Sequence, residues 1–299
     1  MLFGHRINNL EDWGRIYQDR DAFAPLVSYI AGKHGIAYPG IGKCTPGSNG
    51  VFRVGDYIMK IFAPEESEIG GEEDFQTEKF GLERANRLQI AAPKLIASGR
   101  VYDRYIFRYL ILTYIEGESL ADLSGKLSAA EQFDIGRRLR EIVGQMDTPC
   151  ERFNSHVLFG RMAEERWKAF PEGFRREREA YLKTRQGKGE VFVHGDLNPD
   201  NIIIHGGKEI YLIDFADAMA APIELEMAAV ICGGFRFGRD YLRGFLGDYD
   251  RTALTEELLY GLLAHDYGAN IIRDNIGDPG RISSLSELRG RVWAPLCGK

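Results

Sequence analysis

The chain has 299 residues, of which 44% are apolar and 27% charged, the balance of a globular protein with one large domain or two smaller ones. A net charge of −6 argues against nucleic acid and anionic membranes as partners, and no stretch approaches the roughly 18 apolar residues of a membrane span. The N-terminus lacks an apolar signal-peptide core and the four cysteines form no CxxC pair, so a reducing cytoplasm is expected rather than a disulfide framework or a zinc site.

The first part of the chain predicts helices followed by a small sheet. The segments NLEDWGRIYQD and AFAPLVSYIAGKHG read as helices, and the turn cluster CTPGSNG follows them. Next come the β-rich runs VFRV and YIMKIF, a helix in FQTEKFGLERANRLQI, and further strands in PKLIASGRVY and YIFRYLILTYI. We therefore predict a sheet of about five strands with one intervening helix.

The second part of the chain predicts mainly helices. SAAEQFDIGRRLREIVGQM opens with Ser128 and Glu131 in capping-box spacing, and a charged helix is expected over roughly 160–185. VFVHGD, NIII and IYLID are its clear strands, and helices are expected after Pro222. The sequence thus predicts an α+β protein with a small β-rich N-terminal lobe, residues 1–115 including a helical extension, and a larger, mainly helical C-terminal lobe, residues 116–299.

Polar residues interrupt the apolar run VFVHGDLNPDNIII. The two glycines of HGGK suit a tight hairpin between NIII and EIYLID, and this hairpin places Asn201 beside Asp214. Asp196 lies five residues before Asn201, on the loop that leads into the same corner. Two carboxylates and a carboxamide are hard oxygen ligands and proton acceptors, which suits Mg²⁺.

These segments resemble a known pair of motifs. HGDLNPDN (194–201) followed by IDFA (213–216) resembles the catalytic loop and the metal loop of the protein-kinase-like fold. Gly195, where protein kinases usually carry Arg, is similar to the aminoglycoside phosphotransferase and choline kinase group of small-molecule kinases. The resemblance implies a two-lobe protein-kinase-like fold and an ATP-dependent enzyme, with GTP as an alternative donor.

The resemblance also implies roles for particular residues. Asp196 would be the catalytic base that orients the acceptor hydroxyl, and Asn201 and Asp214 would hold the Mg²⁺ ions that bridge the nucleotide phosphates. Taken singly, each motif also fits an ordinary capped turn or a common dipeptide. Their order, with a hairpin between them, favours the functional interpretation.

The N-terminal lobe offers a lysine and a glutamate of the kind such enzymes use. Lys60 lies in the strand run YIMKIF, at the position of the nucleotide lysine in this order of elements, although a lysine at a sheet edge is the alternative. Glu78, near the start of the next helix, is its expected partner, and Glu83 is the second choice.

Two further segments are candidates for nucleotide contacts. GSNGVF (47–52) resembles the short Ser/Asn turn of small-molecule kinases, with backbone N–H groups of Ser48 and Asn49 facing phosphate; an ordinary hairpin turn is the equal alternative. LILTYIEGESL resembles the hinge, with backbone groups of Tyr114 and Ile115 open to an adenine edge.

The acceptor is expected to be a small hydroxyl compound. Only about ten residues separate Asp214 from the next predicted helix, and no Ala-Pro-Glu element follows, which disfavours a peptide substrate. An aminoglycoside or another cation would suit a pocket drawn from the acidic residues of the C-terminal part: Asp240, Asp248, Asp250, Glu256, Glu257, Asp266 and Asp274.

Several alternatives stay open. Choline-like amines, amino alcohols and sugars are further candidate acceptors, and the protein is expected to be a monomer or a dimer. A non-catalytic nucleotide-binding homologue is the main alternative function, although no catalytic group is lost. Glu226-Met227-Ala228 stands where Asp-Leu-Ala is common in this group, which leaves open how the metal loop is braced.

Overall fold

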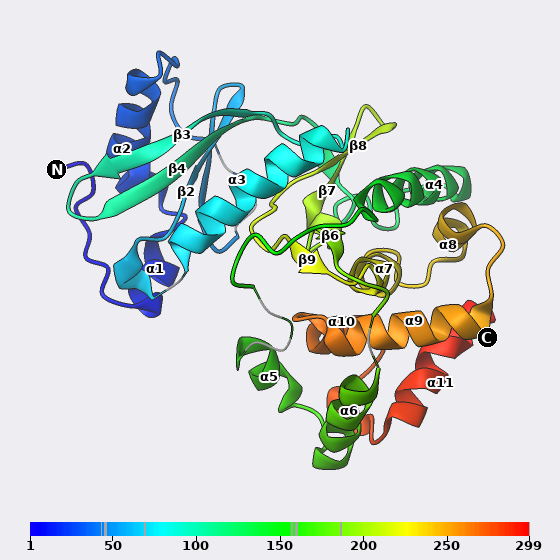
Figure 1. The fold of residues 1–299 in the computed structure, drawn as a ribbon. Coiled ribbons are helices and arrows are strands. Elements are labelled where there is room, and N and C mark those ends of the chain that lie inside the picture. Colours follow the sequence, from blue (N-terminus) through cyan, green and yellow to red (C-terminus); the bar gives the residue numbers. More distant parts are fainter. Residues whose placement is uncertain are drawn as a thin grey trace. The chain divides into compact units, whose positions relative to one another are not determined.

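The computed structural model describes residues 1–42, 44, 47–68, 70–156, 158, 161–185 and 187–298. The chain divides into two compact units. Unit 1 comprises Met1–Asn86 and Ala92–Glu116, and unit 2 comprises Arg87–Ala91 and Gly117–Lys299. Unit 1 is built on a sheet and unit 2 is mainly helical, so the predicted α+β fold class is confirmed (Figure 1).

Unit 1 consists of a four-stranded antiparallel sheet with helices on it. Its strands are β1 (Gly50–Val54), β2 (Tyr57–Ile61), β3 (Leu95–Tyr102) and β4 (Ile106–Thr113), in the order β1-β2-β4-β3. Helices α1 (Leu10–Ile16) and α2 (Arg20–Lys33) precede the sheet, and α3 (Gly71–Arg87) connects β2 to β3. The described residues thus form one strand fewer than the five expected; before β1 they make only an isolated bridge between Gly42 and Arg53. That segment is rich in Gly and Pro, which weaken a regular ladder.

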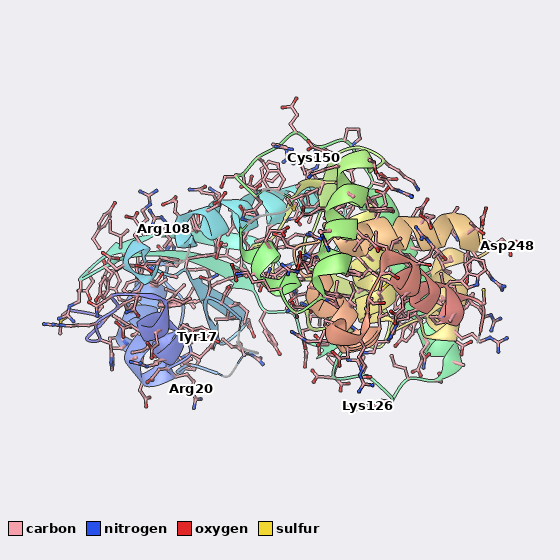
Figure 2. The ribbon with its side chains drawn as sticks, turned by 90° about the horizontal axis from the view of Figure 1, so that it is seen from below. Tyr17, Arg20, Arg108, Lys126, Cys150 and Asp248 are labelled. Carbon is pink, nitrogen blue, oxygen red and sulfur yellow. The ribbon has the colours of Figure 1, made fainter. Side chains whose placement is uncertain are left out.

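The two faces of this sheet have different partners. Alternate strand residues point to opposite faces, so Met59 and Ile61 share one face and Lys60 lies on the other. The first face packs on α1 and α2 through a largely aromatic core that includes Phe3, Trp13, Phe23, Phe52, Met59, Ile61, Phe107 and Tyr109. Tyr17 and Arg20, labelled in Figure 2, mark the short connection between α1 and α2. The N-terminal helices are therefore part of the core of unit 1.

Unit 2 has short strands and a larger set of helices. Strands β5 (Glu118–Ser119), β7 (Ile202–His205) and β8 (Glu209–Leu212) form one sheet, and β6 (Val191–Val193) pairs with β9 (Met219–Ala221). The helices are α4 (Ala129–Met146), α5 (Arg161–Trp167), α6 (Glu172–Thr184), α7 (Glu224–Ala228), α8 (Arg239–Leu246), α9 (Arg251–Ala264), α10 (Gly268–Asn275) and α11 (Leu285–Leu296). None of the described helices has both the length and the apolar composition needed to cross a membrane.

Two local predictions for unit 2 can be compared with the structure. The capping box is confirmed, because Ser128 Oγ accepts from Glu131 N–H at 3.3 Å and Glu131 Oε2 accepts from Ser128 N–H at 2.8 Å. The single helix expected over 160–185 is wrong: α5 ends at Trp167 and α6 begins after Pro171. Pro171 lacks an N–H and has an extended backbone, with φ −54° and ψ 147°, so it starts a new helix rather than continuing the old one.

The predicted hairpin between β7 and β8 is present. Its turn is closed by the Lys208 N–H, which donates to His205 O at 3.0 Å, and its central glycines, Gly206 and Gly207, both have positive φ, 57° and 70°. The register pairs Ile202 with Leu212, and Ile213 N–H then donates to Asn201 O at 3.1 Å. The end of β8 is thereby fixed beside the start of β7, where the candidate site lies.

Candidate functional site

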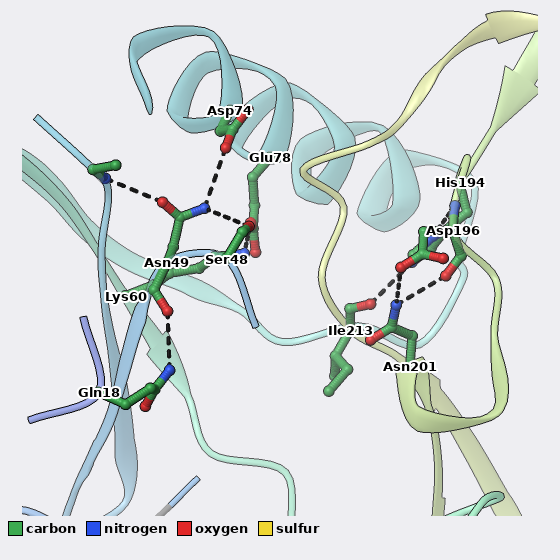
Figure 3. Close-up of polar contacts among 11 residues, drawn as sticks. Gln18, Ser48, Asn49, Lys60, Asp74, Glu78, His194, Asp196, Asn201 and Ile213 are labelled. Atoms are coloured by element: carbon green, nitrogen blue, oxygen red, sulfur yellow. Dashed lines mark hydrogen bonds and ion pairs between the residues drawn. The ribbon is translucent and has the colours of Figure 1, made fainter. Parts of the chain in front are cut away.

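The side chain of Asp196 is held by the loop that follows it. Asn198 caps the 3₁₀ turn Pro199–Asn201 by accepting from the N–H groups of Asp200 and Asn201. Its Nδ2 donates to Asp196 Oδ2 at 2.9 Å. Asn201 Nδ2 donates to the same oxygen at 3.1 Å and to Asp196 O at 2.8 Å, as Figure 3 shows. Asp196 and Asn201, both predicted site residues, are therefore in direct contact.

His194 connects this loop to the segment that carries Asp214. The imidazole is fully buried, and its Nε2 lies 2.9 Å from Ile213 O while Asp196 N–H lies 3.4 Å from its Nδ1. A neutral ring protonated at Nε2 satisfies both contacts. The ring also packs on Phe215, with 4.5 Å between the centroids. His194 thus links the two loops and acts as a structural residue.

Gly195 is required by its surroundings. Its φ is +82°, and a Cβ added there would lie 2.0 Å from Asp217 O, so a side chain would meet both backbone strain and a clash. The Gly195 N–H donates at 2.8 Å to Oε1 of Glu226, whose side chain is buried in α7. Glu226, the residue at which this chain departs from Asp-Leu-Ala, therefore braces the loop that carries Asp196.

The corner around Asp214 has the donor chemistry for a divalent metal. Asp214 follows Ile213 with a left-handed backbone, φ +63°, a conformation that Asp tolerates better than most residues. Asn201 is 8% exposed, and its Oδ1 accepts no hydrogen bond from the described residues. One carboxylate and one carboxamide oxygen fit Mg²⁺, which takes few protein ligands and completes its shell with water and phosphate.

Several carboxylates converge on Asp196. Burial, followed by the charge of Asp217, raises the pKa of Asp196 to about 7; Asp214 and Glu226 add to the increase, and the hydrogen bond from Asn198 opposes it. Burial likewise raises the pKa of Glu226 to about 7. A cation bound in this corner would offset that negative charge. A perturbed carboxylate with specific charged neighbours is typical of a functional site.

A pocket of about 410 Å³ lies next to Asp196, entirely within unit 2. Its lining combines aromatic, amide and charged side chains, among them Asn198, Arg236, Tyr241 and Tyr267. Of the seven acidic residues that the sequence offered for a cationic pocket, Asp274 is the one in this lining, and Arg273 binds it through hydrogen bonds of 2.7 and 3.0 Å. The volume is suitable for a small molecule.

In unit 1 the structure brings together the predicted lysine and glutamate. Lys60 in β2 and Glu78 in α3 form an ion pair whose side chains are 5% and 2% exposed (Figure 3). Glu83, the alternative partner, lies on the exposed side of the helix. A buried lysine needs such a partner because an uncompensated buried charge is very costly.

The loop before β1 is also held in place. Asn49 is 1% exposed; its Oδ1 accepts from Ala63 N–H at 3.1 Å and its Nδ2 donates to Asp74 Oδ2 at 3.2 Å. The side chain of Asn49 is therefore structural. No hydrogen bond joins the backbone N–H groups of Ser48 and Asn49 to the described residues, so these groups remain candidates for phosphate contacts.

One expectation for the hinge needs correction. The backbone N–H of Tyr114 donates to Asp56 O at 2.8 Å, because β2 and β4 are neighbours in the sheet. This N–H is therefore not open to a nucleotide base. Neither backbone group of Ile115 forms a hydrogen bond within the described part of the chain, so Ile115 and the Tyr114 carbonyl remain candidates.

Other residues of the site escaped the sequence analysis. Asn198 was visible in the motif, but its cap and its bond to Asp196 depend on the turn that it forms. Asp217 and Tyr267 are fifty positions apart, yet the Tyr267 hydroxyl lies 3.4 Å from Asp217 Oδ1. His265, in the pocket lining, accepts from Tyr267 N–H at 3.0 Å through Nδ1. No local pattern marks contacts of this kind.

The burial of His265 leads us to predict that the free energy of unfolding depends on pH. Burial, with a smaller contribution from Arg166, lowers the pKa of His265 to about 4. Because the unfolded-state pKa is near 6.5, the unfolded chain takes up this proton first, and stability is lost as the pH falls from about 6.5 to 4. We expect His265→Asn, which keeps an acceptor for Tyr267 N–H, to remove about 2 to 3 kcal/mol of this acid-induced loss.

The measurement is urea unfolding of both proteins at pH 7 and pH 4.5. An equal loss of unfolding free energy in wild type and variant would show that His265 does not carry this dependence.

The fold of this chain is similar to that of several solved structures. An amicoumacin kinase, hAmiN, in complex with AMP-PNP, Ca²⁺ and Ami has a TM-score of 0.57 at 14% identity, covering 89% of this chain and 91% of the other. The GDP and kanamycin complex of APH(2″)-IIia has a TM-score of 0.57 at 15% identity, covering 90% and 98%. Aminoglycoside phosphotransferase APH(3″)-Id from Streptomyces rimosus has a TM-score of 0.56 at 17% identity, covering 84% and 98%.

At these identities the solved structures establish the fold, which is protein-kinase-like as predicted. No curated protein sequence matches the chain. The family described as "Phosphotransferase enzyme family" matches residues 47–260, which include Lys60, Glu78 and the whole Asp196 corner. The chain therefore belongs to the phosphotransferase enzyme family.

Proposed function

We propose that this phosphotransferase moves the γ-phosphate of ATP to a hydroxyl group of a small molecule. The observation that carries the proposal is the corner of unit 2, where hydrogen bonds hold Asp196 and Asn201 together and the β7–β8 hairpin places Asp214 next to them. In this assignment unit 1 is the nucleotide-binding lobe and unit 2 is the catalytic and acceptor-binding lobe. GTP is the alternative donor.

The proposed roles follow from the chemistry of each group. In unit 1, the Lys60 ammonium would contact nucleotide phosphates while Glu78 orients it, and the N–H groups of Ser48 and Asn49 would face phosphate oxygens. Backbone groups of Ile115 and the carbonyl of Tyr114 would meet the base. In unit 2, Asn201 and Asp214 would hold Mg²⁺, which would supply positive charge against the charge of the phosphates.

Asp196 is the proposed catalytic base. It lines the pocket, and its Oδ2 is oriented by Asn198 and Asn201. The acceptor oxygen would form a bond to the γ-phosphorus as the bond from that phosphorus to the β–γ bridging oxygen breaks and ADP leaves. The hydroxyl proton would pass to the Asp196 carboxylate. Most of the catalysis in such a reaction comes from positioning and charge stabilisation.

The acceptor class is open between two possibilities. A cationic acceptor such as an aminoglycoside is favoured by the likeness to proteins solved with kanamycin or Ami. A neutral acceptor such as a sugar is also compatible with the pocket, because Arg273 pairs with Asp274 and the lining contributes Arg236, aromatic rings and amides beside the carboxylates of Asp196 and Asp200. Amino alcohols and choline-like amines lie between these classes.

The proposal is tested by acceptor-dependent consumption of ATP and GTP over a panel of aminoglycosides, amino alcohols, amines and neutral sugars. Formation of a phosphorylated acceptor, confirmed by mass spectrometry, is expected for one class. A protein that binds nucleotide but transfers phosphate to no member of the panel would instead favour the non-catalytic alternative.

Asp196→Asn is expected to lower turnover of the best acceptor by about 10²- to 10⁴-fold, the usual contribution of a general base. The amide is nearly isosteric but does not accept a proton at neutral pH, so nucleotide affinity measured by calorimetry should change little. Asp248→Asn, at an exposed position in unit 2 (Figure 2), is the matched control. Near-normal turnover in Asp196→Asn would contradict the assignment; a parallel loss of nucleotide affinity would make Asp196 a structural residue.

Asp214→Asn is expected to weaken the binding of Mg²⁺ while the protein stays folded. Replacing a carboxylate ligand by an amide should lower the apparent Mg²⁺ affinity by more than about 10-fold, since substituting even a residue that only hydrogen-bonds to a metal ligand lowers the affinity that much. Titration of the transfer rate with Mg²⁺, beside thermal unfolding, measures both properties. An unchanged Mg²⁺ titration would mean that Asp214 is not a ligand.

A further inference from the structure

The helical N-terminal extension contacts the candidate phosphate loop. It precedes residues 47–260, the part that matches the family, yet two of its side chains donate to that loop. Trp13 Nε1 donates to Ser48 O at 2.9 Å, and Gln18 Nε2 donates to Asn49 O at 3.1 Å. The bond from Gln18 is drawn in Figure 3, and all four residues belong to unit 1.

The position of the Trp13 donor is fixed by packing. Trp13 is 1% exposed and belongs to the core between α1, α2 and the sheet, with its ring edge-on to Phe23 at 6.0 Å between centroids. Indole has a single N–H, so this donor has one partner to satisfy, and that partner is the Ser48 carbonyl. A rigid ring therefore determines where this carbonyl lies.

Holding a carbonyl also orients the N–H of the same peptide. The peptide between Ser48 and Asn49 is trans, so the Asn49 N–H points away from the oxygen that Trp13 binds. Gln18 holds the next carbonyl, in the peptide between Asn49 and Gly50, and the Asn49 carboxamide is bound to Ala63 N–H and to Asp74. A turn without the full set of glycines of a phosphate loop is thus anchored on several sides.

We propose that Trp13 and Gln18 are positioning residues of the nucleotide site: Trp13 orients the Asn49 N–H toward phosphate, and Gln18 fixes the next peptide of the same turn. This inference rests on the proposed nucleotide binding by unit 1. The N-terminal extension thereby contributes to nucleotide binding. Because the loop meets phosphates and not the nucleoside, loss of either donor weakens the binding of ATP and leaves the binding of adenosine unchanged.

The test uses two variants of the full-length protein that remove a donor without adding charge. Trp13→Phe keeps an aromatic ring in the core, and Gln18→Met keeps the length of the side chain. Calorimetry with ATP and with adenosine is expected to show a roughly three- to tenfold rise in the Kd for ATP per lost hydrogen bond, with the Kd for adenosine unchanged. In turnover, the KM for ATP should rise and kcat at saturating ATP should hold.

Matched controls come from unit 2. Trp167→Phe changes a fully buried indole whose Nε1 has no hydrogen-bond partner among the described residues, and Gln145→Met changes an exposed glutamine; neither should alter ATP binding. Unchanged ATP affinity in both test variants would overturn the inference, and so would an equal loss for ATP and adenosine. If Trp13→Phe is unstable, Gln18→Met alone decides. Failure of the wild type to bind ATP or GTP would reject the proposed function itself, and this inference with it.

Discussion

The candidate site of unit 2 depends on one buried hydrogen bond, from Gly195 N–H to the carboxylate of Glu226. A carboxylate removed from water is costly, and backbone N–H donors of the loop offset only part of that cost, because burial still raises the pKa of Glu226 to about 7. The contact joins α7 to the turn between β6 and Asp196. Gly195 makes it possible, because its positive φ and missing side chain let the turn approach Asp217 O closely.

The remaining contacts of this corner extend from that brace. His194 is hydrogen-bonded to the Ile213 carbonyl, and the Ile213 N–H donates to the Asn201 carbonyl. These bonds connect the loop that carries Asp196 to the loop that carries Asp214. Burial, followed by the negative charge gathered there, raises the pKa of Asp196, and a cation bound in this corner would offset that charge. In unit 1, too, the candidate nucleotide-binding groups are held by buried polar contacts, such as those of Lys60 with Glu78 and of Asn49 with Asp74.

The features that could be predicted from the sequence are those encoded locally. The glycines of HGGK determined the hairpin, and the hairpin determined that Asn201 and Asp214 meet. The alternation in YIMKIF turned Lys60 away from the apolar face, toward α3. The split of the expected helix at Pro171 was equally readable and was missed.

The features that could not be predicted depend on packing between distant segments. Glu226 and Gly195 are 31 positions apart, and Trp13 and Ser48 are 35 apart; no spacing rule joins them. The Tyr114 N–H is bound to Asp56 O because β2 and β4 are neighbours in the sheet, and this strand order could not be predicted from the sequence. The pocket draws its lining from several helices and loops of unit 2, so its balance of charge became visible only in three dimensions.

We propose that Glu226 holds the loop that carries Asp196 in the shape that phosphate transfer requires. The most direct measurement compares turnover of Glu226→Gln, which keeps an acceptor for Gly195 N–H, with that of Glu226→Leu, which leaves this buried N–H without a partner. An unpaired buried donor costs about 1 to 3 kcal/mol, so we predict near-normal turnover in the first and a loss of about 5- to 150-fold in the second, with nucleotide affinity retained in both. Wild-type turnover in Glu226→Leu would contradict it.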